Sequence, residues 1–179
     1  EWDVAITDFT DDEADKLLLV FDPLAAMAEA GEPAVLTARQ LERWPVRMDG
    51  LDDDVLVVEN PSVVAHAVSS TSAVPVVCTG GWPNVAVLSL LRQLARSGIR
   101  LRCHADFDPA GILIVRYLVD QVGAVPWAMT AERYSSMVDR SSVEFSGSVA
   151  DTPWDPALAI LMRTRRKAVF EEDVRHSLT

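Results

Sequence analysis

Carboxylate side chains follow two of the apolar runs in this sequence, at the points where those runs end. Glu59 comes directly after Val55–Val58, and Asp106 and Asp108 come after Ile99–Ala105. Ligands of an open parallel sheet bind beyond the carboxyl ends of its strands, so we expect the three carboxylates to lie together there. Converging carboxylates repel one another unless a cation neutralises them, and oxygen ligands without cysteine suit Mg²⁺ or Mn²⁺. The spacing therefore predicts a divalent-metal site that could polarise a phosphoryl oxygen and activate water.

Three further polar residues are candidates for accessory roles at this site. His104 could bind the metal or shuttle a proton, although a hydrogen-bonded structural role is slightly favoured for it. Asn60 and Asn84 are the other two accessory candidates. Asp108 also has a plainer interpretation, because aspartate before Pro109 fits a helix N-cap with proline at the first helical position. On spacing alone, the metal site and the helix cap are equally supported.

The elements that must position these residues alternate between short apolar runs and longer helical stretches. Strands are expected at Val55–Val58, Val74–Cys78, Ile99–Ala105 and Ala124–Met129, and helices at Pro61–Ser69, Asn84–Ser97 and Pro109–Val122. Strands separated by helices form parallel sheets with right-handed crossovers, and runs without polar alternation are buried on both faces. The sequence predicts an α/β fold: a parallel sheet of about four strands with helices on both faces.

Three regions are expected along the chain. Residues 1–50 form a helical preface, with a helix from the capping box at Thr10 to Ala30 and a second helix from Thr37. Residues 51–130 form the core, and residues 131–179 form a C-terminal extension packed on it. Thr130 is expected to cap one helix of that extension and Thr152 the final helix. The chain opens without methionine, which fits a preface that continues a missing N-terminal module.

Composition limits the classes of protein and of partner. The chain has 179 residues with 49% hydrophobic content, and no apolar run is long enough to cross a membrane or to mark export, so we expect a cytoplasmic location and no membrane partner. The net charge of −11 argues against strong DNA binding by this chain alone. The one dense basic cluster could contact phosphates, although positive charge at a helix C-terminus explains it more simply. Its members are Arg163, Arg165, Arg166 and Lys167.

Two motifs within residues 55–115 resemble a Toprim domain, and more specifically the A subunit of type VI topoisomerases. Asp106–Ile112 is similar to that family's Asp-x-Asp-Pro-x-Gly segment, and Gly81–Ala86 to its Gly-Tyr-Pro-Asp-x-Ala segment. The resemblance implies a Toprim fold and Mg²⁺ chemistry on nucleic-acid phosphodiesters. Asn84 replaces an aspartate of the second segment, and neither Tyr117 nor Tyr134 matches the topoisomerase catalytic tyrosine. Hydrolysis is therefore expected rather than covalent strand passage.

From about residue 32 to the end, the chain also resembles bacterial proteins with a C-terminal Toprim-like domain of unknown function. The segments Glu59–Val63 and Thr152–Pro156 carry that likeness. Those proteins are similar to the JetD nuclease subunit of Wadjet anti-plasmid systems. The resemblance implies a nuclease acting on DNA in anti-plasmid defence or DNA processing, with condensin-like SMC subunits as partners.

Two other functions remain open. A non-catalytic Toprim-like docking module would have no need of a divalent ion at the three carboxylates. A haloacid-dehalogenase-like phosphatase also carries Asp-x-Asp after a strand, but this chain has Ala110 where that family has threonine or valine. The phosphatase is therefore the weaker alternative.

Overall fold

The computed structural model describes residue 27 and residues 30–43, 54–69 and 75–174. The chain divides into two compact units, Glu1–Val35 and Leu36–Thr179, and the elements below belong to the second. Most of the expected helical preface, including the helix from Thr10 to Ala30, lies outside the described residues. The second preface helix is present as α3 (Ala38–Arg43), with Leu41 buried.

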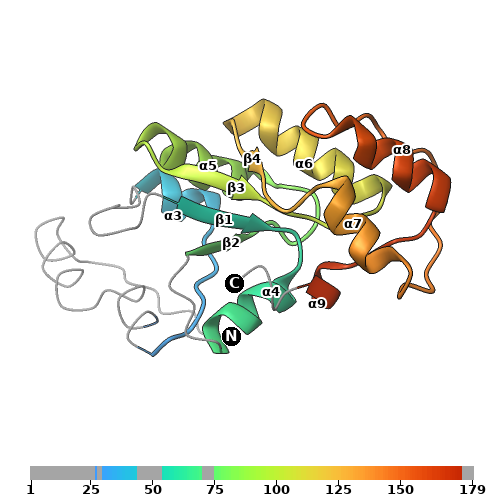
Figure 1. The fold of residues 1–179 in the computed structure, drawn as a ribbon. Helices are drawn as coiled ribbons and strands as arrows, with labels where there is room; N and C mark the ends of the chain where they lie inside the picture. Colours follow the sequence, from blue (N-terminus) through green and yellow to red (C-terminus); the bar gives the residue numbers. More distant parts are fainter. Residues whose placement is uncertain (1–26, 28–29, 44–53, 70–74, 175–179) are drawn as a thin grey trace, which may run out of the picture. The chain divides into compact units, whose positions relative to one another are not determined.

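A four-stranded parallel sheet forms the centre, as predicted (Figure 1). Its order is β2-β1-β3-β4, where β1 is Asp54–Val58, β2 Val76–Cys78, β3 Arg100–Cys103 and β4 Val125–Pro126. The apolar side chains of β1 are at most 2% exposed, which explains their lack of polar alternation. β3 and β4 end earlier than the sequence predicted, because the chain leaves the sheet after Cys103 and after Pro126.

Helices cover both faces of the sheet. α4 (Pro61–Ser69) lies on one side, and α5 (Val85–Arg96) and α6 (Pro109–Val122) lie together on the other (Figure 1). The strand order requires this arrangement with right-handed crossovers, since the chain moves outward from β1 to β2 and then back past β1 to β3. Among the described residues, no helix is long and apolar enough to cross a membrane.

The C-terminal extension contains α7 (Ala131–Val138), α8 (Pro156–Arg165) and α9 (Glu171–Val174). Thr130 caps α7 as predicted, its side chain accepting a hydrogen bond from Arg133 N. The segment Thr152–Asp155 leads into the last long helix as predicted, but the helix begins later than the expected proline, at Pro156. Asp155 is the N-cap of α8, and its carboxylate accepts from Ala157 N. The Thr152 hydroxyl donates to the Asp155 carbonyl and accepts from Ala159 N.

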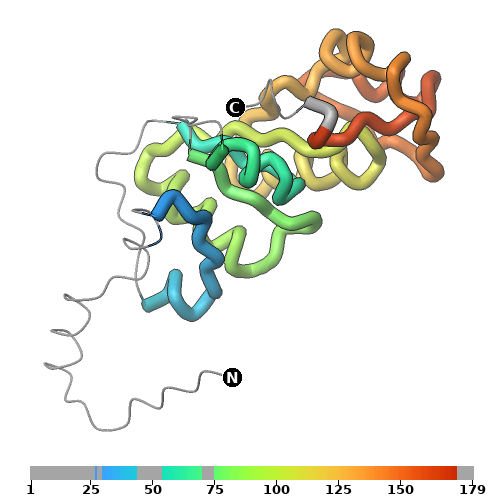
Figure 2. The backbone as a smooth tube through the Cα atoms, turned by 90° about the horizontal axis from the view of Figure 1, so that it is seen from below, coloured from blue at the N-terminus to red at the C-terminus, as the bar shows by residue number. Residues whose placement is uncertain are grey.

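Residues 167–172, which we call the strap, return from α8 toward the sheet and lead into α9 beside α4 (Figures 1 and 2). Two isolated antiparallel bridges hold the strap: Val169 pairs with Phe107, and Lys167 pairs with Glu144. The Tyr134 hydroxyl donates to the Lys167 carbonyl over 2.7 Å. The sequence analysis did not predict these bridges.

The start of α6 explains the spacing of Asp-x-Asp-Pro-x-Gly. Asp108 is the N-cap, with Oδ1 accepting from Gly111 N at 2.7 Å, and Pro109 takes the first helical position. A Cβ at Gly111 would lie 2.0 Å from the Asp106 carbonyl oxygen, far inside contact distance. Glycine is thus the residue that lets the helix approach the backbone carrying Asp106.

We expect Gly111→Ala to destabilise the fold, because the added methyl meets backbone atoms that cannot rotate away. The loss should be about 3 kcal/mol, at the upper end for an overpacked site, and chemical denaturation would measure it. Ala110→Ser, at the exposed neighbouring position, is the control and should change stability by well under 1 kcal/mol. Equal stability of Gly111→Ala and wild type would contradict the close approach.

Candidate carboxylate site

Glu59 and Asp106 meet at the carboxyl edge of the sheet, as the strand-end argument predicted. Glu59 follows β1 directly, and its Oε2 accepts a hydrogen bond from Asp106 N at 3.3 Å. β1 and β3 are paired neighbours in parallel register, with Val57 opposite Cys103, so the residues after them leave the sheet side by side. Both side chains are only partly exposed.

A third carboxylate, Glu171, joins them from α9 and was missed by the sequence analysis. Its backbone N–H donates to Asp106 Oδ1 at 2.7 Å. Its own Oε2 accepts from Glu59 N at 2.9 Å and from Asn60 N at 2.6 Å. The three residues therefore form a closed ring of hydrogen bonds, which we call the carboxylate ring. In it the carboxylate of Glu59 accepts from Asp106 N, that of Asp106 from Glu171 N, and that of Glu171 from Glu59 N.

Asp108 is the N-cap of α6, as the plainer interpretation predicted, and it also lies near the carboxylate ring. Its negative charge is close enough to contribute to raising the pKa of Glu59 and of Asp106. One oxygen, Oδ1, is engaged with Gly111 N.

His104 is buried behind the ring, in contact with one ring carboxyl and one aromatic side chain. Its Nδ1 lies 3.0 Å from Glu171 Oε1, and its ring packs edge-on against Phe107 with centroids 5.6 Å apart. Burial, reinforced by the positive charge of Arg133, lowers the pKa of His104 to about 3. The contact with Glu171 is therefore a hydrogen bond of a neutral imidazole at neutral pH rather than an ion pair.

Burial also raises the pKa values of the ring carboxyls. The pKa of Asp106 rises to about 7 and that of Glu171 to about 8, in both cases mainly because desolvation disfavours the charged form. Hydrogen bonds from backbone N–H groups oppose both shifts, and neighbouring carboxylates add to them. The pKa of Glu59 is raised for the same leading reason. Such perturbed acids at one sheet edge are typical of functional sites, although structural networks produce them as well.

The two asparagine candidates have different surroundings. Asn60 borders the ring: its Oδ1 accepts from Ser62 N at the start of α4, and its Nδ2 donates to Glu172 Oε1 at 2.7 Å. Asn84 is exposed and caps α5 by accepting from Val87 N. No contact joins the Asn84 side chain to the carboxylate ring among the described residues.

All four members of the basic cluster make contacts within the fold. Arg163 donates to the Val149 carbonyl and Asp151, and Arg165 pairs with Asp139. Arg166 donates to the Phe145 carbonyl, and Lys167 Nζ donates to the Ser141 carbonyl. Arg163 and Arg165 lie in the last turn of α8 and Arg166 is its C-cap, which places positive charge at the C-terminus of this helix.

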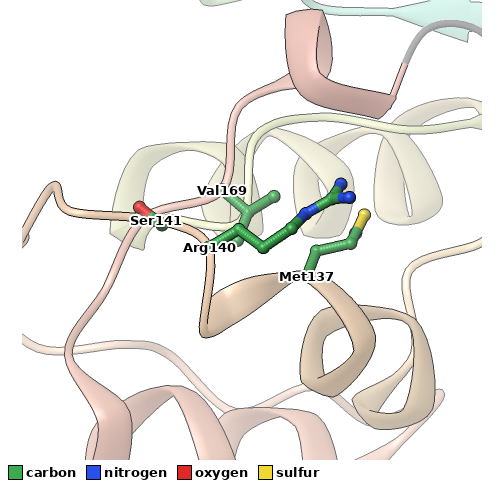
Figure 3. Close-up of a pocket in the computed structure, with 4 residues that line it drawn as sticks. All are labelled: Met137, Arg140, Ser141 and Val169. Carbon is green, nitrogen blue, oxygen red and sulfur yellow. The ribbon is translucent and has the colours of Figure 1, made fainter.

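A hollow of about 200 Å³ lies beside the strap (Figure 3). Met137, Arg140, Ser141 and Val169 line it. The Arg140 side chain extends along the hollow next to Met137 (Figure 3). None of the ring carboxylates lines it, so the hollow is separate from the candidate site.

The donor chemistry of the site suits a hard divalent cation, because Glu59, Asp106 and Asp108 offer carboxylate oxygens and neither cysteine joins them. Cys103 is buried in β3, and Cys78 donates its thiol to the Glu59 carbonyl. Within the described part of the chain, however, no group of three His, Cys, Asp or Glu side chains is arranged to hold an ion. Glu59 Oε2, Asp106 Oδ1 and Asp108 Oδ1 accept backbone N–H groups, so a metal would bind through the other oxygen of each carboxylate after a movement of the side chains.

A family model described as "Protein of unknown function C-terminus (DUF2399)" matches residues 34–179. No curated protein and no solved structure matches the chain. The matched region contains every element of the candidate site, from β1 to α9. The family description names no activity, so the chemical role of these residues has to be argued from their geometry.

Between pH 6.5 and 8 we expect the metal-free protein to lose stability as the pH rises. The raised folded-state pKa values of Asp106 and Glu171, about 7 and 8, mean that the folded state holds more protons than the unfolded state in this window. His104 does not reverse this trend, because its folded-state pKa is lowered from an ordinary value of 6.5. Thermal denaturation in a chelating buffer at several pH values would measure the slope.

Asp106→Asn should flatten that slope, because the amide cannot ionise while its oxygen can still accept from Glu171 N. Asp120→Asn, at an exposed position of α6, is the matched control and should leave the slope unchanged. A melting temperature that rose between pH 6.5 and 8 would contradict the assignment of buried, proton-holding carboxyls.

Proposed function

We propose that the chain, which belongs to the family described as "Protein of unknown function C-terminus (DUF2399)", is the Toprim-like domain of a Mg²⁺-dependent nuclease that hydrolyses DNA phosphodiesters. The observation that carries the proposal is the hydrogen bond of Asp106 N to Glu59 Oε2. It joins the carboxylate after β1 to the Asp-x-Asp segment after β3, which is the pairing that the Toprim resemblance implies. Mn²⁺ is expected to substitute for Mg²⁺ at oxygen ligands.

The proposed roles follow from what each side chain can reach. Asp106 and Asp108 would hold the metal, since they share a segment and carry the Asp-x-Asp spacing. Glu59, partly exposed and with a raised pKa, would orient the attacking water and accept its proton. When bound, the metal would supply electrostatic stabilisation of the phosphoryl oxygens.

DNA, an N-terminal module of a longer chain and condensin-like SMC subunits are the proposed partners, in an anti-plasmid defence or DNA-processing system. The JetD-like motifs support this part of the proposal. The charge of the chain supports it too: the net charge is −11, and the members of the basic cluster make hydrogen bonds within the fold. The DNA would be held mainly by partners.

The competing proposal is a docking module that keeps the fold without catalysis. The observation that favours it is the carboxylate ring itself, because its oxygens accept backbone hydrogen bonds as a purely structural network would. A docking module needs no divalent cation, so metal binding separates the two proposals.

In the full assembly acting on circular DNA, Asp106→Ala and Asp108→Asn should each abolish Mn²⁺ binding and plasmid cleavage. Asparagine is chosen at Asp108 because it preserves the α6 cap. Glu59→Gln should lower cleavage by about 10²–10⁴-fold while keeping much of the metal affinity, as expected for loss of a general base. Calorimetry and a nicking assay would measure the two properties.

Asp120→Asn, exposed on α6, serves as the control and should bind metal and cleave like wild type. Cleavage that persisted in a variant carrying both Asp106→Ala and Asp108→Asn would place the nuclease elsewhere and favour the docking module.

We also expect Mg²⁺ to raise the melting temperature more at pH 8 than at pH 6. The ion competes with protons for the carboxyls, and at pH 6 the raised pKa of Asp106, about 7, leaves that group largely protonated. Differential scanning fluorimetry with and without Mg²⁺ tests this. An equal shift at both pH values, or the same shift in Asp106→Ala, would count against metal binding at the ring.

A further inference from the structure

Glu171 uses both of its carboxyl oxygens within the protein and is 0% exposed. Oε2 accepts from Glu59 N and Asn60 N, and Oε1 lies 3.0 Å from His104 Nδ1. A carboxyl group buried this completely costs free energy unless its acceptors are satisfied. It is enclosed rather than presented to a ligand, so it can influence chemistry only through the groups that it holds.

What Glu171 holds is the peptide that carries Glu59. The carbonyl of Glu59 accepts hydrogen bonds from Gly80 N at 3.1 Å and Gly81 N at 3.3 Å, in the loop after β2. The amide of Glu59 donates to Glu171 Oε2. The backbone is thus fixed on both sides, from the sheet neighbour and from α9, and the side chain of Glu59 is directed toward Asp106 N.

Glu171 also acts on the second carboxylate, through its backbone. The Glu171 N–H donates to Asp106 Oδ1, which fixes one oxygen of Asp106. This contact depends on the strap, because Val169, two residues earlier, is paired with Phe107: Phe107 N donates to the Val169 carbonyl at 2.8 Å. The strap therefore places the Glu171 side chain against the backbone of Glu59 and the Glu171 amide against the carboxylate of Asp106.

We infer that Glu171 is a positioning residue of the proposed metal site, and that Glu59 and Asp106 adopt their working arrangement only while the strap is docked. The inference rests on the proposed function for its chemical meaning. The positioning itself is a property of the metal-free protein, because the hydrogen bonds that carry it involve no ion.

The first test measures amide exchange residue by residue by NMR in the metal-free protein. In Glu171→Ala, the amides of Glu59 and Asn60 should exchange about tenfold faster than in wild type, the factor expected for loss of one buried hydrogen bond. Glu172→Gln is the matched control: Glu172 is exposed and accepts from the Asn60 side chain, not from either of these backbone amides, so the amides should stay protected. Leu158→Ala, a cavity variant at a buried position of α8, controls for general loss of stability.

The second test titrates the same proteins with Mn²⁺ alone. Glu171→Ala should weaken Mn²⁺ binding by about 10–100-fold, the usual effect of removing a residue that orients metal ligands. Glu172→Gln and Leu158→Ala should stay within about twofold of wild type. Glu171→Gln, which keeps an oxygen for the two amides, should recover most of the affinity. Glu171→Met, which has a similar size but no such acceptor, replaces Glu171→Ala if that variant does not fold.

The two tests separate this inference from the proposed function. If wild type binds no Mn²⁺, the metal site is wrong, and amide exchange still decides whether Glu171 positions Glu59. Unchanged protection of Glu59 and Asn60 in folded Glu171→Ala or Glu171→Met, neither of which offers an acceptor to the two amides, overturns the positioning. So does an equal loss of Mn²⁺ affinity in Leu158→Ala, since the effect would then reflect stability alone.

Discussion

The reciprocal hydrogen bonds of the carboxylate ring are the interaction on which the arrangement of the sheet edge depends. Where a strand ends, its last backbone N–H groups lose their ladder partners and need other acceptors if they are buried. Here carboxylates from neighbouring segments supply those acceptors. Glu59, Asp106 and Glu171 each accept from a backbone N–H of one of the others, so the backbone fixes the positions of these side chains. The cost of burying three acids together appears as their raised pKa values.

Backbone contacts also restrict which residues can occupy the segment after β3. Asp108 caps α6, and Pro109 takes the first helical position, where a backbone N–H has no partner within the helix. Gly111 has no side chain because α6 begins against the Asp106 carbonyl. Three positions of the Asp-x-Asp-Pro-x-Gly motif, Asp108, Pro109 and Gly111, therefore have structural explanations. Asp106 differs, because it does not cap a helix and its carboxylate accepts from Glu171 N in the carboxylate ring.

The sheet and its helices could be predicted from local periodicity. The proximity of Glu59 and Asp106 could be predicted because the carboxyl ends of parallel strands lie at one edge of a sheet. It missed Glu171 because that contact spans 65 residues and depends on isolated bridges, which leave no periodic pattern. The start of α8 was also misplaced, since both Thr152 and Asp155 carry capping side chains and precede a proline. Only the tertiary contacts decide: Asp155 also accepts from Ala131 N, which ties α8 to the start of α7.

The negative charge of the carboxylates at this sheet edge would repel a phosphate group. Acids with raised pKa values are partly protonated near neutral pH, which limits the repulsion that phosphate would otherwise meet there. A divalent cation would reduce it further by replacing protons with a localised positive charge. Three arginines of the basic cluster, Arg163, Arg165 and Arg166, make hydrogen bonds to Val149, Asp139 and Phe145, and the net charge of the chain is −11. Under the proposed function, catalysis and substrate binding are then separate tasks: this domain would provide the carboxylates, and the positive surface that brings DNA to them would belong to a partner.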